Sequence, residues 1–172
     1  MNLSIIVAVS ENGVIGLNGD MPWKKLPSDL KFFKETTMGH WCILGRKTYD
    51  ALGGKVLPGR RFIIITRDTA YQSADSLVVH SVFEAMHHPA IADEKQVFVL
   101  GGGDIYRQLR PYCNTIYLTR IHASFDGDTY FNTPDEEEWI LAERVSVQQD
   151  EYNPYDHDFL TYKRKRSDTG KL

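Results

Sequence analysis

The sequence predicts an α/β protein, a single domain with a central mixed, mostly parallel eight-stranded sheet, helices on both faces and an antiparallel C-terminal strand. Short apolar runs alternate with helix-like stretches along most of the chain, which is typical of parallel strands joined by crossover helices. The last two strand-like stretches, at about 139–148 and 159–165, have only a turn between them, and this favours an antiparallel finish. A length of 172 residues fits one domain with a sizeable core.

Composition and charge argue against several classes of protein. The net charge of −3 provides no overall basic field for nucleic acid. No apolar run reaches membrane-spanning length, and the apolar run at 3–9 is too short and lacks the basic flank of a signal peptide. Cys42 and Cys113 offer neither a metal-ligand spacing nor a disulfide framework. We therefore expect a cytoplasmic protein without metal, nucleic-acid or membrane partners.

The N-terminal third is predicted to form a strand, a loop and a helix. Leu3 to Val9 is apolar and β-branched without alternation, as in a strand buried on both faces. Ser10 to Asp20 carries two Asn-Gly turns, and we interpret it as a mobile lid, with an ordinary surface connection as the alternative. A helix is expected from Pro27 to about Thr37, because proline suits the first helical position.

Asp29 stands out on this helix because it falls near the middle of the apolar side, one turn before Phe33. An inward-pointing carboxylate among apolar side chains is costly to bury unless it has a partner. The helix alone leaves two interpretations open. Asp29 is either an acid favoured by the helix dipole in the first turn, or a buried acid that binds a ligand with hydrogen-bond donors.

Three of the next strands are predicted to end at features that suit phosphate. Trp41 to Leu44 runs into Gly45-Arg46-Lys47-Thr48 and a short helix to Leu52, Phe62 to Thr66 ends at Arg67, and Gln96 to Leu100 enters Gly101-Gly102-Gly103 and a helix to about Leu109. Because ligands of parallel sheets bind beyond the carboxyl ends of the strands, we expect these features to share one edge. Arg46, Lys47 and Arg67 suit a phosphate monoester, the group that distinguishes NADP from NAD.

The remaining elements are predicted from local signals. Leu77 to His80 is a short strand, and Ser81 with Glu84 forms a capping box at the start of a helix that reaches Met86. Thr115 to Ile121 is a strand with clear alternation. The His87-His88 pair is interpreted as an exposed helix end rather than a metal site, and residues 167–172 as a frayed polar tail.

Together these residues resemble the dihydrofolate reductase family of the chromosomal bacterial type. The matching motifs follow the family's order from Met1 to about Arg166. They are Gly13-Val14-Ile15-Gly16, Met21-Pro22-Trp23, Leu26-Pro27-Ser28-Asp29-Leu30, Phe33-Lys34, Gly45-Arg46-Lys47-Thr48, Leu57-Pro58-Gly59-Arg60, Gly101-Gly102-Gly103, Ile105-Tyr106, Leu118-Thr119, and Gly127-Asp128 followed by Phe131. The combination is highly specific and covers most of the chain.

The resemblance implies NADPH-dependent reduction of 7,8-dihydrofolate to 5,6,7,8-tetrahydrofolate by hydride transfer, which supplies one-carbon metabolism and thymidylate, purine and glycine synthesis. It also implies diaminopyrimidine and pteridine antifolates as inhibitors, and a monomer. Asp29 would accept two parallel hydrogen bonds from the pterin, and Thr119 would orient it. An apolar pocket raises the pKa of an aspartate from about 3.9. Whether Asp29 donates the proton itself or through water stays open.

The resemblance also assigns site residues by matching position. Catalytic roles fall to Asp29, Thr119, Tyr106 and Trp23. The substrate would contact Ile6, Ala8, Asp29, Leu30, Phe33, Lys34, Leu52, Leu57, Arg60, Leu100 and Thr119. NADPH would contact Ala8, Ile15, Gly16, Leu17, Met21, Gly45, Arg46, Lys47, Thr48, Thr66, Arg67, Leu100, Gly101, Gly102, Gly103, Ile105 and Tyr106. The lid from Asn12 to Trp23 would close over the nicotinamide with Asp128 reaching across to it, and the Gly101-Gly102 peptide would be cis.

Three departures from the family pattern accompany the resemblance. The segment from Trp23 to Pro27 carries one extra residue, the stretch Gly53 to Leu57 is looser than usual, and Asp104 places an acid near the expected pyrophosphate. Two other functions remain open. Reductases of riboflavin precursors share the fold and NADPH, although the Asp29 helix and Arg60 favour folate. A non-enzymatic NADP- or pterin-binding module would need no hydride geometry.

Overall fold

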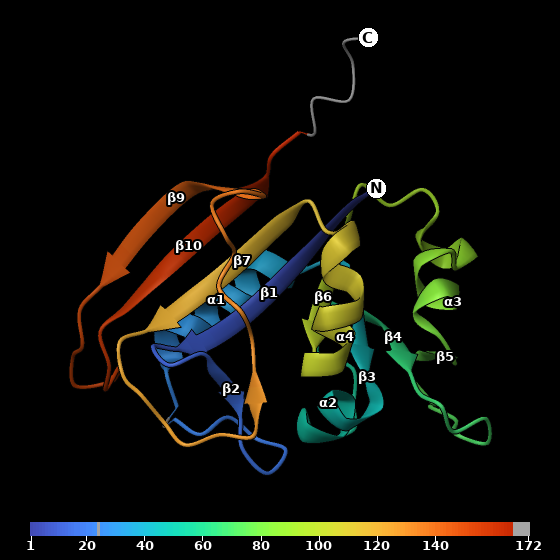
Figure 1. The fold of residues 1–172 in the computed structure, drawn as a ribbon. Coiled ribbons are helices and arrows are strands. Elements are labelled where there is room, and N and C mark those ends of the chain that lie inside the picture. The colour runs from blue at the N-terminus through green and yellow to red at the C-terminus, as the bar shows by residue number, and fades with distance from the viewer. Residues whose placement is uncertain (24, 167–172) are drawn as a thin grey trace, which may run out of the picture.

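A computed structural model describes residues 1–23 and 25–166, so Lys24 and the predicted tail at 167–172 lie outside the described residues. The main sheet has eight strands in the order β5-β4-β3-β6-β1-β7-β10-β9 (Figure 1). From β5 to β7 every neighbouring pair is parallel, and β10 is antiparallel to both β7 and β9. The predicted fold class, including the antiparallel C-terminal strand, is confirmed.

The elements follow the predicted order closely. The strands are β1 (Asn2–Ser10), β2 (Val14–Gly16), β3 (Trp41–Gly45), β4 (Arg61–Ile65), β5 (Leu77–Val79), β6 (Gln96–Gly101), β7 (Thr115–Ile121), β8 (Thr129–Tyr130), β9 (Trp139–Val147) and β10 (His157–Arg164). The α-helices are α1 (Pro27–Thr37), α2 (Arg46–Ala51), α3 (Val82–Met86) and α4 (Gly103–Leu109), and two 3₁₀ turns span Pro89–Ile91 and Arg110–Tyr112.

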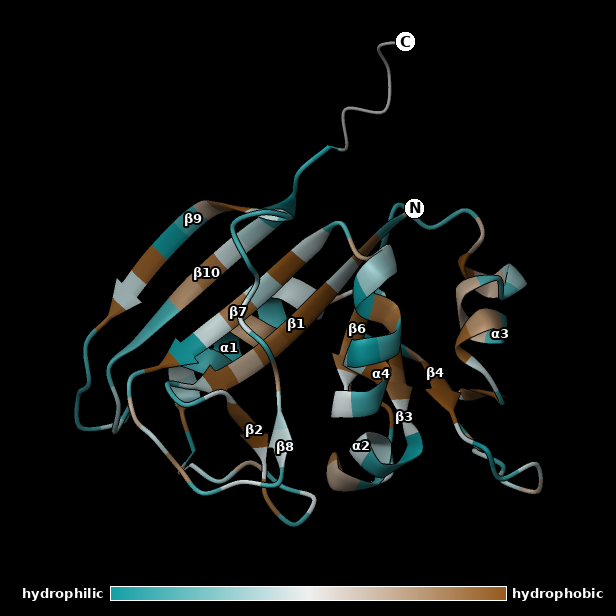
Figure 2. Cartoon of the chain, in the orientation of Figure 1, coloured by the Kyte–Doolittle hydropathy of each residue, from teal (hydrophilic) through white to brown (hydrophobic). Residues whose placement is uncertain are grey.

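Helices cover both faces of the sheet, whose central strands carry many hydrophobic residues (Figure 2). Each face has its own apolar core. Because side chains alternate along a strand, Ile5 of β1 faces the core that contains Leu109 of α4, whereas Ile6 faces the core lined by Tyr49 of α2 and Phe33 of α1. The central strands read as nearly continuous apolar runs for this reason. The sheet therefore carries α1 and α2 on one face and α3 and α4 on the other.

The lid differs from the loop that the sequence predicts. Its residues Val14–Gly16 form β2, which pairs antiparallel with β8 in a second, two-stranded sheet. Strand β2 has three residues and β8 has two, so neither is long enough to show a periodic signal in the sequence. Each becomes a strand only by pairing with the other, which lies more than 110 residues away along the chain. The start of the lid is also fastened, because the Asn12 side chain donates to Phe125 O over 2.8 Å.

Three further features concern the cysteines, the helices and the metal-ligating side chains. Cys42 and Cys113 are both buried and carry free thiols. None of the helices in the described part of the chain combines the length and apolar character that a membrane span requires. Within residues 1–23 and 25–166 no cluster of three or more His, Cys, Asp or Glu side chains is arranged to hold a metal ion.

Candidate active site

The carboxylate of Asp29 is hydrogen-bonded to the sheet beneath α1. The Thr119 hydroxyl donates to Asp29 Oδ1 over 2.6 Å. Thr119 lies on β7 opposite Ala8 of β1, and Phe159 of β10 lies opposite Thr119 on the other side. Phe32 of α1 stacks on Phe159 with ring centroids 4.4 Å apart. The N-terminal half of α1 therefore sits over the neighbouring strands β7 and β10.

Burial controls the protonation of Asp29. Desolvation raises the pKa of this carboxyl above its usual range, and the hydrogen bond from Thr119 and the nearby His157 oppose the rise. The sequence-based expectation of a raised pKa in an apolar pocket is confirmed in direction. Such an acid is poised to exchange a proton closer to neutral pH than an exposed aspartate.

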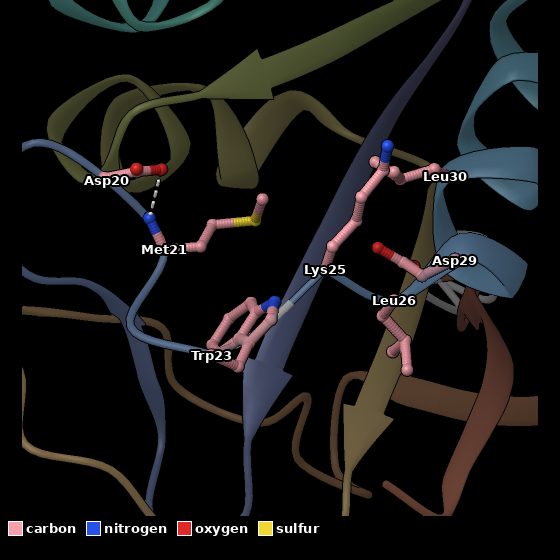
Figure 3. Close-up of a pocket in the computed structure, with 7 residues that line it drawn as sticks. All are labelled: Asp20, Met21, Trp23, Lys25, Leu26, Asp29 and Leu30. Carbon is pink, nitrogen blue, oxygen red and sulfur yellow. Dashed lines mark hydrogen bonds between the residues drawn. The ribbon is translucent and has the colours of Figure 1, made fainter. Parts of the chain in front are cut away.

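A pocket of about 210 Å³ opens in front of Asp29 (Figure 3). Its lining comes from the end of the lid and the start of α1, namely Asp20, Met21, Trp23, Lys25, Leu26, Asp29 and Leu30. Figure 3 shows Met21 and Trp23 across the pocket from Leu30 and Asp29. Sequence reasoning named four of these residues as site residues and missed Asp20, Lys25 and Leu26, although Lys25 lies in the segment with the extra residue.

An apolar wall continues from this pocket along the sheet. Ile6 and Leu100 are buried in one core cluster, against which Phe33 and Leu57 are packed. Ala8 instead packs against the cluster of Trp23, Leu26 and Ile121. Most of the apolar substrate-binding residues predicted from the sequence are therefore brought together. Leu52 and Lys34 are exposed at the ends of α2 and α1, outside these clusters.

Arg60 is buried with unused hydrogen-bonding capacity. Only 9% of the residue is exposed, and its Nε and Nη1 atoms find no hydrogen-bond partner within the described part of the chain. Burial lowers the pKa of the guanidinium from its ordinary value, but arginine remains charged at any physiological pH. A buried, charged fork without a partner is costly unless a carboxylate or phosphate satisfies it. Arg60 therefore fits the acidic end of a ligand.

The predicted phosphate features do share one edge of the sheet. Strands β3 and β4 are parallel with Gly45 opposite Ile65, so Arg46 and Thr66 leave the two strands side by side. Thr66 is buried, whereas Lys47 and Arg67 are exposed. The Arg46 guanidinium lies 5.6 Å from the Tyr71 ring centroid. Three cations and a hydroxyl thus gather beyond the ends of β3 and β4, as a phosphate monoester requires.

The glycine run lies next to this edge. The peptide bond between Gly101 and Gly102 is cis, as the resemblance implies. A Cβ atom on Gly102 would come within 3.2 Å of Thr48 Oγ1, and one on Gly103 within 2.6 Å of the Thr129 methyl group of β8. Neither α2 nor α4 has a side-chain cap at its first turn. The backbone of the glycine run and the uncapped first turns of α2 and α4 therefore lie at this edge without side chains in front of them, an arrangement that fits the close approach of a pyrophosphate.

The side chain of Tyr106 holds the backbones of β1 and β6 together between the Asp29 pocket and the glycine run. Its hydroxyl oxygen lies 2.7 Å from Ile6 O and 2.8 Å from Leu100 O, so its single proton bridges the middle of β1 and the end of β6. Burial raises the pKa of this hydroxyl, which keeps it a neutral donor. Gly101 has φ 111°, and a side chain there would meet the Tyr106 ring within 2.9 Å.

The lid is tied to the loop before β8. The Asp128 carboxylate accepts a hydrogen bond of 2.8 Å from the Asn18 N–H, and the Asp128 N–H donates to Gly16 O over 2.9 Å. The Asn18 and Thr129 donors hold the pKa of Asp128 below its usual range. At the other end of the lid, the buried Trp23 packs against Phe125 with ring centroids 5.8 Å apart. Asp128 thus reaches the lid as the resemblance implies.

Asp104 is directed to its own helix. Its carboxylate pairs with Arg107 and accepts 2.7 Å from Gln108 Nε2, and the Arg107 bond holds its pKa below the usual range. The carboxylate is neutralised locally, so it presents less negative charge to the glycine run than its position in the sequence indicates.

These features define an α/β protein that combines a dinucleotide-type edge with a desolvated acid in a pocket, the arrangement of a pyridine-nucleotide reductase. The sequence profile of the family described as "Dihydrofolate reductase" matches residues 2–164. The chain belongs to the dihydrofolate reductase family, whose members are NADP-dependent oxidoreductases. The recognition from sequence motifs is confirmed.

Individual relatives agree with this placement. The chain is 38% identical over 165 residues to dihydrofolate reductase of Bacillus subtilis (strain 168), covering 96% of each chain. It is 40% identical over 169 residues to that of Staphylococcus haemolyticus, covering 96% of this chain and 98% of the relative. A solved dihydrofolate reductase from Enterococcus faecalis, complexed with NADP(H) and RAB-propyl, superposes with a TM-score of 0.86 at 41% identity, covering 95% and 96% of the two chains.

Proposed function

We propose that this protein reduces 7,8-dihydrofolate to tetrahydrofolate with NADPH and that Asp29 is the acid that holds the pterin ring. The observation that carries the proposal is the desolvated Asp29 carboxylate, which faces the pocket while Thr119 bonds one of its oxygens. The second oxygen is free to accept from a ligand. The 2-amino group and neighbouring ring nitrogen of a pterin present two parallel donors, which a carboxylate can accept together.

The chemistry requires a proton at the imine nitrogen and a hydride at the adjacent carbon. When bound, NADPH supplies the hydride, and the protein supplies orientation and electrostatics. Asp29 keeps the pterin in register and raises the local availability of the proton, because its own pKa is raised by burial. Trp23 and Met21 line the pocket on the side of the lid, and the buried Trp23 ring limits the access of bulk water. Tyr106 keeps Ile6 O and Leu100 O together beside the place for the nicotinamide.

The two ends of the site match the two ends of the reactants. Arg60 has buried, unpartnered guanidinium nitrogens that suit the α-carboxylate of the substrate's glutamate. The exposed cations at the ends of β3 and β4 suit the 2′-phosphate of NADPH, and the bare glycine backbone suits its pyrophosphate. The fit of both halves favours an enzyme over a binding module that would need only one.

Turnover tests the proposal directly. Purified protein should oxidise NADPH in the presence of dihydrofolate, form tetrahydrofolate in equal amount, and be blocked by a 2,4-diaminopyrimidine. NADH should be a poorer donor because it lacks the phosphate for Arg46 and Arg67. Binding of NADPH without turnover of dihydrofolate would refute the enzymatic function and favour the non-enzymatic binding module. Turnover of a ribosylaminopyrimidine in preference to dihydrofolate would favour the riboflavin-precursor reductase.

The oligomeric state and location are proposed as a monomer in the cytoplasm. The site is assembled entirely from one chain, with residues from α1, β1, β6 and β7, so catalysis requires no second copy. A mass near 19.7 kDa by light scattering supports the monomer. A dimer at working concentration would contradict it.

A further inference from the structure

The first turn of α1 is held by residues far away in the sequence. Its N-cap residue is Leu26, whose side chain makes no capping hydrogen bond, and Pro27 has no N–H. The next N–H, that of Ser28, donates instead to Asn153 Oδ1 over 2.9 Å. Asn153 lies 125 residues further along, in the turn between β9 and β10. The helix that carries Asp29 is thus capped by a distant amide.

A second bond fixes the same residue of α1. The Ser28 hydroxyl lies 2.5 Å from Nε2 of His157, the first residue of β10. His157 Nδ1 lies 2.8 Å from Tyr155 O, and because a carbonyl only accepts, Nδ1 carries the proton. In the neutral ring Nε2 then accepts the proton of Ser28 Oγ. His157 has no exposed surface, so its two ring nitrogens are satisfied within the protein.

The turn that supplies these groups is itself well fixed. Asp150 accepts hydrogen bonds from the backbone N–H and the side-chain amide of Asn153 over 2.7 and 3.1 Å, which leaves Oδ1 of Asn153 as the acceptor for Ser28. Asn153 is 8% exposed. The ring of His157 packs edge-on against Phe159, with centroids 5.3 Å apart. Buried polar groups with complete partners of this kind specify one arrangement of a core.

Two consecutive helix residues therefore bind two neighbouring strands. Ser28 bonds His157 of β10, and Asp29 bonds Thr119 of β7. Thr119 is opposite Phe159, and His157 is two residues before Phe159 on the same face of β10. Beyond this turn, Phe32 of α1 stacks on Phe159 of β10. An apolar ring contact of this kind defines the position of the helix along the strand less sharply than a directional hydrogen bond does.

We propose that His157 and Asn153, acting through Ser28, are positioning residues that set the place of the Asp29 carboxylate relative to the bound pterin. The inference rests on the proposed function, in which Asp29 is the pterin anchor. The rate of a reaction depends strongly on the position of the reacting groups, because a shift of about 1 Å can lower the rate about 100-fold. Loosening the first turn of α1 should therefore reduce recognition of the pterin more than recognition of NADPH.

Paired substitutions separate positioning from mere stabilisation. His157→Gln places an amide oxygen where Nε2 was and can still accept from Ser28, whereas His157→Asn reaches only toward Tyr155 O. Both are neutral, and each keeps one of the two bonds. Ser28→Ala removes the hydroxyl from the other side and keeps the N–H bond to Asn153. His87→Asn, at the exposed end of α3 on the opposite face, is the control and should behave as wild type.

The readouts are kcat/KM for dihydrofolate, the Kd of 2,4-diaminopyrimidine, the Kd of NADPH and the thermal midpoint. We expect His157→Asn and Ser28→Ala each to lose about 10-fold in kcat/KM and in diaminopyrimidine affinity, with NADPH affinity changed less than about 2-fold. His157→Gln should recover most of the loss. The Ser28→Ala/His157→Asn double variant should lose no more than either single variant, because both remove the same bond.

The outcomes are distinct from those of the proposed function. Suppose that the wild-type protein turns over dihydrofolate and that Ser28→Ala has the same kcat/KM and the same diaminopyrimidine affinity. This result overturns the positioning role alone, whatever happens to the thermal midpoint. Equal losses in His157→Gln and His157→Asn also overturn it, because they would report packing rather than the bond to Ser28. A wild-type protein that neither turns over dihydrofolate nor binds 2,4-diaminopyrimidine overturns both proposals. Should His157 variants fail to fold, Ser28→Ala decides alone.

Discussion

Thr119 and Asp29 lie 90 residues apart, and the Thr119 hydroxyl donates a 2.6 Å hydrogen bond to the Asp29 carboxylate. The bond joins the helix that carries the acid to the central strand β7. It also occupies one carboxylate oxygen and directs the other toward the pocket. The position of the acid therefore depends on an interaction between α1 and the sheet rather than on the helix alone.

Thr119→Val should weaken the site with little change in shape. Without the hydroxyl, the pKa of Asp29 should rise further, because that hydrogen bond opposes the effect of burial. A hydrogen bond to a charged group is worth about 1.5–3 kcal/mol, so kcat/KM for dihydrofolate should fall about 10- to 100-fold. The matched control is Thr115→Val at the other end of β7, where the hydroxyl bonds Lys163. A similar loss of activity in both variants would assign the effect to strand packing.

Arg60→Lys should raise KM for dihydrofolate about 10-fold or more and leave the affinity for NADPH unchanged. Lysine keeps the charge but loses the planar fork that binds a carboxylate through two bonds. Arg61→Lys is the control, since the neighbouring Arg61 is exposed and pairs with Glu94 over 3.1 Å. A folate analogue without the glutamate should show no difference between Arg60→Lys and wild type. A loss with that analogue as well would contradict the role given to Arg60.

Asp128→Asn should loosen the lid. The carboxylate accepts from the Asn18 N–H, and an amide in its place offers a weaker, uncharged acceptor. We expect the Kd of NADPH to rise about 3- to 10-fold, because the lid covers the expected nicotinamide pocket. Asp126→Asn, two residues earlier in the same loop and also exposed, should bind NADPH as wild type does. Fluorescence titration measures both, and equal effects would mean that net charge rather than the Asn18 bond is responsible.

Asp29 should cost the ligand-free protein stability at neutral pH. Its folded pKa is raised, so between the unfolded value near 3.9 and the folded value the native state binds more protons than the unfolded state. The contribution of this group therefore favours folding most below the unfolded pKa and is lost as pH rises through the folded pKa. Asp29→Asn should gain stability over wild type at pH 7 and lose that advantage near pH 4. Urea unfolding at the two pH values measures the difference, and a larger advantage at pH 4 would contradict a raised pKa.

The sequence predicts most of the fold because its signals are local. The apolar run at 115–121 predicts β7 with the bounds that the structure has, and Pro27 marks the start of α1. The prediction also gathers Arg46, Arg67 and the glycine run at one edge, since parallel strands expose their carboxyl ends together.

The parts that sequence reasoning missed depend on partners distant along the chain. Strands β2 and β8 form only by pairing with each other. Ser28 was within a recognised motif, yet its role depends on His157, which local patterns place only near the start of a strand. Lys25 gives no periodic signal in the sequence, and only the structure shows that it lines the pocket.

The most direct test of the account is the pH dependence of NADPH oxidation with dihydrofolate in wild type and Asp29→Asn. The account predicts that Asp29→Asn loses most of its activity at neutral pH and retains NADPH affinity. Its residual rate should climb as pH falls, because substrate then arrives already protonated. Wild-type turnover by Asp29→Asn at neutral pH would remove Asp29 from the mechanism.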